Sequence, residues 1–199
     1  MKKSIRPYMT NNEILLFKKY LLKSENYIEF GAGGSTLYAI ENNIKNISTI
    51  ETDLEWIKKI KSFELIKKKL DNNELIIKYL DLECTWWKHV TWSTSSEECN
   101  KRNWPLYSKL ADDCKFTPDL ILIDGRFRVA TALESIKLMT NETYLLFHDY
   151  MDFRKQYYVI EKFFDKIEKI GKLQVFKKKN IIDKEELHSV IEEYRLLID

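Results

Sequence analysis

Two stretches of the chain place titratable side chains directly after a short apolar run. Asp124 follows the run at residues 119–123, and His148 with Asp149 follows the run at residues 144–147. An imidazole, with an unperturbed pKa of about 6.5, can take a proton from a hydroxyl as that hydroxyl attacks. A neighbouring carboxylate orients the ring and favours its protonated form. We therefore treat His148, Asp124 and Asp149 as candidate catalytic residues, the alternative for His148 being a polar strand cap bonded to backbone.

Two arginines follow Asp124 closely in the sequence. Arg126 and Arg128 can pair with a substrate carboxylate or phosphate through two parallel hydrogen bonds. Alternatively, one of them neutralises the acidic residues around it. The residue types leave both interpretations open.

A glycine-rich stretch is the strongest single pattern. The chain has five glycines, and three of them fall within residues 29–36, at Gly31, Gly33 and Gly34. Glycines at a sharp turn from strand to helix let the backbone approach a ligand, and the start of the helix offers free N–H groups to an anion. The alternative is a tight turn in which the glycines serve packing alone. Glu51 ends the next apolar run, where an acid accepts hydrogen bonds from ribose hydroxyls.

The elements that position these residues alternate between strand and helix. We expect a helix from a capping box at Thr10 to Glu13, and further helices between the strands, one of them carrying Val159 to Ile170. Such alternation predicts a doubly wound, Rossmann-like α/β domain with a mostly parallel sheet and helices on both faces, whose ligands lie beyond the carboxyl ends of the strands. The expected strands are residues 27–30, 47–51, 75–77, 119–124, 144–147 and 173–176.

Over residues 27–150 the sequence resembles the class I S-adenosylmethionine-dependent methyltransferases. The resemblance is carried by Glu29, Gly31 and Gly33, followed by Glu51. Nicotinamide dehydrogenases are the competing match, but their pattern has a third glycine where this chain has Thr36, and their first strand usually lacks the acid.

One departure from the usual methyltransferase pattern indicates a subgroup. The pattern has a further glycine at position 35, where this chain has Ser35. The variant resembles that of small-molecule O-methyltransferases with this fold.

The resemblance implies a role for each of these positions. Gly31, Ala32, Gly33 and Ser35 would contact the amino-acid end of S-adenosylmethionine. Glu29 would bind its ammonium group, directly or through water. Glu51 would bind the ribose, and Asp81 would bind the adenine amino group, unless Asp81 is only a turn residue at a strand end.

The resemblance also suggests a site for a bound metal. Asp124 and Asp149 match two ligands of the metal-dependent O-methyltransferases, and Mg²⁺ favours such oxygen ligands. Tyr150 does not match the third ligand. Mg²⁺ and a His148 base are therefore alternative ways to activate the acceptor.

Residues 81–107 interrupt the alternation of strands and helices. This stretch holds four of the five tryptophans, and Trp86 and Trp87 are candidate substrate contacts because aromatic faces stack on sugar rings. The stretch is either a substrate lid or a packed insertion. Residues 1–26 are a helical lead-in within a single domain spanning residues 1–199, and the segment before the helix either folds over the cofactor or is a disordered lead-in.

Composition narrows the class of protein. Lys and Arg number 33 against 31 Asp and Glu, so the net charge of +2 gives no general case for nucleic acid or an anionic membrane. Three widely spaced cysteines are not a disulfide framework, which fits the cytoplasm. We expect an S-adenosylmethionine-dependent methyltransferase acting on a hydroxyl of a small molecule, preferably a carbohydrate. The alternatives are a nicotinamide-dependent oxidoreductase and a non-catalytic cofactor-binding module.

Overall fold

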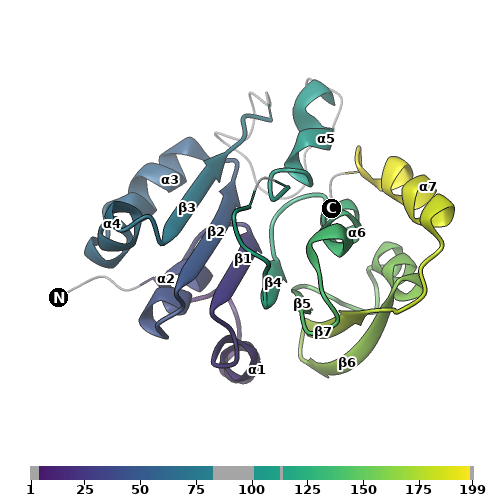
Figure 1. The fold of residues 1–199 in the computed structure, drawn as a ribbon, viewed down its shortest axis with the longest axis horizontal. Helices are drawn as coiled ribbons and strands as arrows, with labels where there is room; N and C mark the ends of the chain where they lie inside the picture. The colour runs from purple at the N-terminus through teal and green to yellow at the C-terminus, as the bar shows by residue number, and fades with distance from the viewer. Residues whose placement is uncertain (1–4, 83–100, 113, 198–199) are drawn as a thin grey trace.

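The sheet of this protein has seven strands in the order β3-β2-β1-β4-β5-β7-β6 (Figure 1). The computed structural model describes residues 5–82, 101–112 and 114–197. Strands β1 to β5 pair in parallel, and β7 joins β5 and β6 antiparallel. The chain leaves β1 toward β2 on one side and returns to β4 on the other. Such a reversal of strand order opens a crevice at the carboxyl ends of β1 and β4.

Helices cover both faces of the sheet, as the sequence predicts. The strands are β1 (Asn26–Phe30), β2 (Asn46–Glu51), β3 (Leu75–Tyr79), β4 (Leu120–Ile123), β5 (Tyr144–Phe147), β6 (Phe164–Ile170) and β7 (Leu173–Lys178). The α-helices are α1 (Asn11–Leu21), α2 (Gly34–Glu41), α3 (Leu54–Lys61), α4 (Glu64–Asp71), α5 (Trp104–Tyr107), α6 (Arg128–Ser135) and α7 (Lys184–Tyr194). The 3₁₀ helices are η3 (Lys101–Asn103), η4 (Ile136–Leu138) and η5 (Lys155–Lys162).

The side chains of β4 show how the two cores divide. Leu120 and Leu122 are fully buried against α1, α2 and α4, while Ile121 and Ile123 are fully buried against α5, α6 and α7. Because side chains alternate along a strand, a strand buried on both faces is apolar at every position. The uninterrupted apolar run of β4 therefore marks the centre of the sheet.

One expected helix is absent. The apolar residues from Val159 to Ile170 have helical spacing, but the structure ends η5 at Lys162 and continues as β6. Ile167 and Ile170, which a helix would have buried, are 48% and 37% exposed. A two-residue turn begins at Gly171, whose φ of 57° suits glycine, and it folds β6 back on β7. Pairing with β7 therefore overrides the helical spacing.

The parallel sheet fixes the residues that follow its strands. The backbone N–H of Gly31 donates to Ile50, that of Asp124 donates to Phe30, and that of His148 donates to Ile123. Each bond continues the strand pairing beyond the last strand residue. The three sequence regions singled out above are thus held at one edge of the sheet.

Glu29 is a buried carboxyl that supports the glycine-rich loop. It lies on β1, is fully buried, and accepts hydrogen bonds from the hydroxyls of Tyr27 and Thr36. The Thr36 hydroxyl in turn accepts from the Gly33 N–H at 2.8 Å. Burial raises the pKa of Glu29 to about 7, although the neighbouring hydroxyls oppose this shift. Glu29 thus fixes the loop from below through Thr36.

The raised pKa of Glu29 predicts a pH-dependent stability. The unfolded chain ionises this group near pH 4.5 and the folded chain only near pH 7, so its contribution to the free energy of unfolding falls between these values. Relative to wild type, Glu29→Gln should gain stability across this window, by on the order of 3 kcal/mol at most, and then level off. Denaturant unfolding at intervals from pH 4 to 8 measures the difference.

The exposed Glu25 provides the control. Glu25→Gln should follow the wild-type stability profile at every pH. A Glu29→Gln profile parallel to wild type would show that this carboxyl does not titrate in the window.

Candidate functional site

A cavity of about 320 Å³ lies at the carboxyl ends of β1 and β4. Its wall combines the glycine-rich loop, Trp56 from α3, Asp124, and the N-terminal segment, by which we mean residues 5–8. The cavity lies where the reversal of strand order predicts a ligand site. Four of the predicted cofactor-binding residues line it: Gly31, Ala32, Gly33 and Ser35.

Gly31 lines the cavity and also packs closely against the backbone of Asp124. Its φ is 100°, and a Cβ there would lie 3.1 Å from the carbonyl carbon and oxygen of Asp124. The exits of β1 and β4 are therefore packed backbone against backbone. Glycine is required here because of this close backbone contact and because of the positive φ. The sequence pattern alone does not reveal either reason.

Trp56 was not among the residues singled out from the sequence. Its indole N–H donates to the Ala32 carbonyl at 2.7 Å, and its ring lies 3.6 Å from where a Cβ on Gly33 would be. Asp53 caps the helix that carries Trp56 by accepting from the Trp56 backbone N–H at 2.9 Å. Asp53 therefore serves its own helix.

The N-terminal segment lies directly on the glycine-rich loop. A Cβ on Gly34 would collide with the Arg6 carbonyl and the Pro7 nitrogen. Tyr8, at the end of this segment, is 93% exposed beside the cavity. The structure shows this segment packed on the loop, and that it folds over a bound cofactor stays a prediction.

That Glu51 and Asp81 contact a ligand stays a prediction. One Glu51 oxygen accepts from the backbone N–H groups of Thr52 and Asp53, at 2.6 and 3.0 Å, and burial raises the pKa of Glu51. Asp81 is exposed beyond the end of β3. Neither residue lines the cavity.

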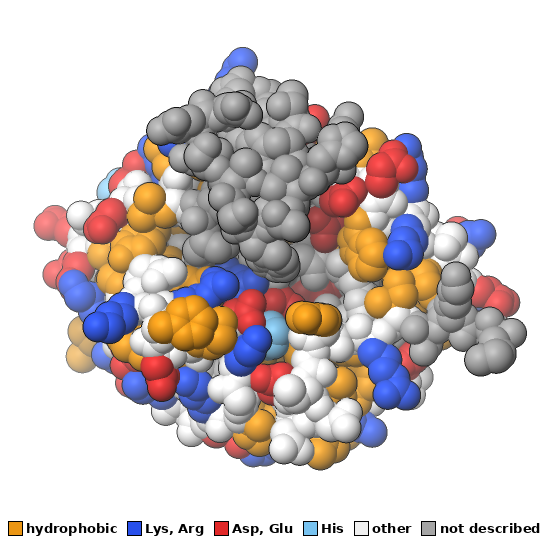
Figure 2. Space-filling view, turned by 180° about the vertical axis from the view of Figure 1, so that it is seen from behind, with side chains coloured by type: hydrophobic (Ala, Val, Ile, Leu, Met, Phe, Trp, Pro, Cys, Tyr) orange, Lys and Arg blue, Asp and Glu red, His pale blue; other side chains and the backbone are white. Residues whose placement is uncertain are grey.

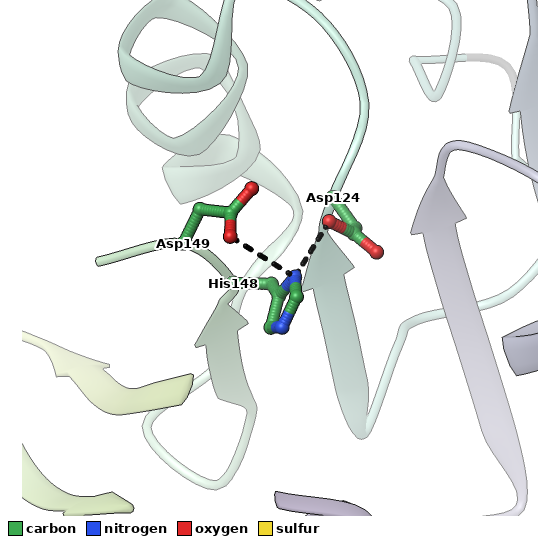
Figure 3. Close-up of side chains that lie close together, drawn as sticks. All are labelled: Asp124, His148 and Asp149. Atoms are coloured by element: carbon green, nitrogen blue, oxygen red, sulfur yellow. Dashed lines mark hydrogen bonds and ion pairs between the residues drawn. The ribbon is translucent and has the colours of Figure 1, made fainter. Parts of the chain in front are cut away.

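His148, Asp124 and Asp149 come together as the sequence predicts (Figure 3). The His148 Nδ1 lies 2.9 Å from an Asp124 oxygen and 3.9 Å from an Asp149 oxygen. Burial lowers the pKa of His148, but the hydrogen bond and negative charge of Asp124 outweigh this, so the pKa is raised. Asp149 has a φ of 59°, in the left-handed region.

Arg128 corrects one prediction. It is 2% exposed, and its guanidinium donates to Asp149 at 2.9 Å and to the His148 carbonyl at 2.8 Å. It also lies 3.6 Å from Asp124. A guanidinium so enclosed cannot bind a substrate carboxylate or phosphate, and the alternative, neutralisation of acidic neighbours, is what the structure shows. Burial raises the pKa of Asp149, but the charges of Arg128 and His148 outweigh this and lower it.

The same contacts bear on a bound Mg²⁺. The two carboxylates and the imidazole are close enough together to hold an ion. However, Arg128 already donates to one Asp149 oxygen, and the Asp124 oxygen nearest Arg128 is also bonded to His148. The positive charge that a cation would supply is present in Arg128, so these residues do not fit a magnesium site.

Glu13 belongs to this cluster and was recognised in the sequence only as part of a capping box. It is 2% exposed, and its carboxylate accepts from the backbone N–H groups of Thr10, at 2.7 Å, and Lys172, at 2.6 Å. The His148 Nε2 lies 4.0 Å from Glu13. Burial raises the pKa of Glu13, but these hydrogen bonds and the nearby His148 outweigh that effect, so the pKa is lowered overall. Nothing in the spacing of Glu13 indicates this second role.

Of the remaining residues predicted to bind substrate, the structure describes Arg126. Arg126 is half-buried, and its backbone N–H donates to the Tyr107 hydroxyl at 3.2 Å. Trp86 and Trp87 lie outside the described residues. Trp104 is 1% exposed and its ring packs on Phe127, so Trp104 belongs to the core, and the choice between a lid and a packed insertion for residues 81–107 stays a prediction.

The described surface carries mixed charge. On the face shown in Figure 2, acidic and basic side chains lie intermixed with hydrophobic ones. None of the helices in the described ranges has the length and apolar character that a bilayer crossing requires.

Comparison with solved structures identifies the fold. A methyltransferase-like protein from Silicibacter pomeroyi is 25% identical, with 98% of each chain covered and a TM-score of 0.73. An O-methyltransferase from Bacillus cereus, solved with SAH (S-adenosylhomocysteine), is 12% identical over 85% of this chain and 82% of that one, with a TM-score of 0.54. An SAH-bound methyltransferase from Podospora anserina is 14% identical over 84% and 77%, with a TM-score of 0.50.

No protein-family model matches the sequence, and no curated protein matches it. The likeness is therefore one of structure. Strand order, the glycine-rich exit of β1 and the cavity beside it agree with the resemblance seen in the sequence. The chain has the fold of the class I S-adenosylmethionine-dependent methyltransferases.

Proposed function

We propose that this protein transfers a methyl group from S-adenosylmethionine to a hydroxyl of a small molecule, preferably a carbohydrate. The observation that carries the proposal is the cavity enclosed by the glycine-rich loop and Asp124. It brings a backbone cradle and a carboxylate together at the reversal point of the sheet. Two structural neighbours solved with SAH support the choice of cofactor.

When bound, S-adenosylmethionine supplies a methyl group already activated on a sulfonium, so the protein chiefly provides alignment and proton removal. The backbone of residues 31–35 would bind the amino-acid end of the cofactor. Trp56 keeps that backbone in place through the Ala32 carbonyl. The N-terminal segment, packed on Gly34, forms one wall of the cavity.

The acceptor side supports a hydroxyl. Asp124 lines the cavity, and a carboxylate there can receive the proton that a hydroxyl loses on methylation. The exposed ring of Tyr8 beside the cavity offers a face on which a sugar can stack. These two features, with the tryptophan-rich stretch 81–107, support a carbohydrate acceptor.

A nicotinamide cofactor is the alternative that the structure disfavours. Position 36, where the dehydrogenase pattern has glycine, holds a fully buried threonine whose hydroxyl joins Gly33 to Glu29. This side chain is part of the support of the loop.

The widely spaced cysteines favour a reducing, cytoplasmic setting for the reaction.

The first prediction under this proposal concerns the cofactor. S-adenosylmethionine and SAH should both bind in calorimetric titrations and raise Tm, while NAD and NADP should do neither. Gly31→Val should abolish binding, because the branched side chain would press on the Asp124 backbone and move the loop. Binding of NAD alone would overturn the proposal, and binding of SAH without methylation of any acceptor would indicate a non-catalytic module.

A second prediction separates two neighbouring acids. Glu51→Ala should weaken SAH binding by about 1–3 kcal/mol, the cost of removing a charged hydrogen-bond partner. Asp53→Ala is the matched control, because Asp53 caps its own helix and should affect mainly Tm. Calorimetry on both variants measures the difference, and equal losses would contradict the assignment of Glu51 to the ribose.

A third prediction concerns the metal. Since Arg128 supplies the positive charge among Asp124, His148 and Asp149, methyl transfer should proceed unchanged in excess EDTA. Turnover with and without chelator, in protein treated to remove divalent ions, is the measurement. Loss of turnover in chelator and its return with Mg²⁺ would show that these carboxylates hold an ion after all.

A further inference from the structure

His148 presents no nitrogen to the cavity. Its side chain is 4% exposed, and its Nδ1 is engaged by Asp124 at 2.9 Å. Its Nε2 is buried and has no hydrogen-bond partner among the described residues, and it lies 4.0 Å from the buried Glu13. A general base must reach the proton that it removes. Neither ring nitrogen meets that condition.

Asp124 is placed differently. It lines the cavity and its side chain is 25% exposed. One of its oxygens is bonded to His148, and the second points away from both His148 and Asp149 (Figure 3). No described residue donates a hydrogen bond to that second oxygen. The carboxylate therefore has one oxygen fixed by the protein and one left for a ligand.

The imidazole is held from several sides. Asp124 from the end of β4, Asp149 from the end of β5 and Glu13 from α1 surround it with negative charge, while Arg128 from α6 forms ion pairs with the two aspartates. Glu13 is itself fixed by the N-cap of α1 and by the turn between β6 and β7. His148 thus connects the acceptor side of the cavity to rigid parts of the fold.

We propose that His148 is a positioning residue, which holds one oxygen of Asp124 so that the other oxygen of Asp124 meets the acceptor hydroxyl. This inference rests on the proposed methyl transfer and assigns its proton acceptor. The acceptor hydroxyl loses its proton to Asp124, and its oxygen forms the new bond to the methyl carbon. The electron pair of the broken carbon–sulfur bond stays on sulfur.

Two substitutions of His148 distinguish positioning from proton removal. In His148→Asn the amide nitrogen takes roughly the place of Nδ1 and still donates to Asp124, but it cannot act as a base. We expect kcat of His148→Asn within about tenfold of wild type, and that of His148→Ala and Asp124→Asn to fall by about 10²- to 10⁴-fold. The Kd for SAH should stay unchanged in both His148 variants.

The assay uses a panel of monosaccharide and catechol acceptors with S-adenosylmethionine. His188→Asn, an exposed site on α7, is the matched control and should retain wild-type kcat. Equal loss in His148→Asn and His148→Ala, with unchanged Kd for SAH, would make His148 the base and overturn the proposal. Full activity of Asp124→Asn would overturn it as well.

A second measurement needs no acceptor. Diethyl pyrocarbonate modifies accessible imidazoles. The folded protein is treated with the reagent and then digested, and mass spectrometry of the peptides reports which histidines have reacted. The exposed His188 should be modified at pH 7, and the buried His148 should stay unmodified with or without SAH. Modification of His148 at the rate of His188, with protection by SAH, would place the ring at the cavity and overturn the proposal.

The two arms separate failure of the proposal from failure of the function. If SAH does not bind the wild-type protein, the methyltransferase assignment fails whatever the histidines show. If SAH binds but no acceptor in the panel is methylated, the modification experiment still decides whether His148 reaches the cavity.

Discussion

The continuation of backbone pairing beyond the strands is the constraint on which the rest of the site depends. Gly31, Asp124 and His148 each extend their strand's hydrogen bonding by one residue, so their Cα atoms are fixed by the sheet. Gly31 and Asp124 then meet backbone to backbone. A loop built in this way costs little further ordering when a ligand arrives, because its geometry is already determined by the sheet.

Charge at this edge is largely compensated within the protein. Asp124, Asp149 and Glu13 are opposed by Arg128 and by an imidazole whose pKa is raised. Removing one member of such a buried group leaves its partners uncompensated, at a cost that exceeds the value of any single pair. Asp149 also occupies a left-handed backbone conformation, which aspartate tolerates better than most residues, and Arg128 binds its side chain there.

Much of this arrangement could be predicted from the sequence, because the signals are local. The strands β1 to β5 are short, mostly apolar runs, the capping residue Thr10 acts within its own helix, and the glycine-rich loop has its own spacing. The misassigned element, β6, depends on pairing with β7, which the helical spacing of its own residues does not reveal.

The roles that sequence could not supply depend on contacts between distant segments. Arg128 follows Asp124 by four residues and is aimed at Asp149 only because β4 and β5 are neighbours. Trp56 reaches the glycine-rich loop from another helix, and Glu13 reaches His148 from the N-terminal end of the chain. A pattern of residue types says where chemistry is available, whereas burial decides which side chain can reach a ligand.

The contact of Glu13 with the turn at Lys172 has a consequence for how the chain acquires its structure. These residues are 159 positions apart, and Tyr20 and Lys19 from the same helix bind Glu168 across similar separations. Closing such long loops precedes any gain from the contacts, which slows folding in proteins dominated by distant pairs. During synthesis on the ribosome, the first helix emerges early and its buried glutamate meets its partners only when the last hairpin has been made. The contacts around Glu13 and His148 are therefore among the last parts of the molecule to form.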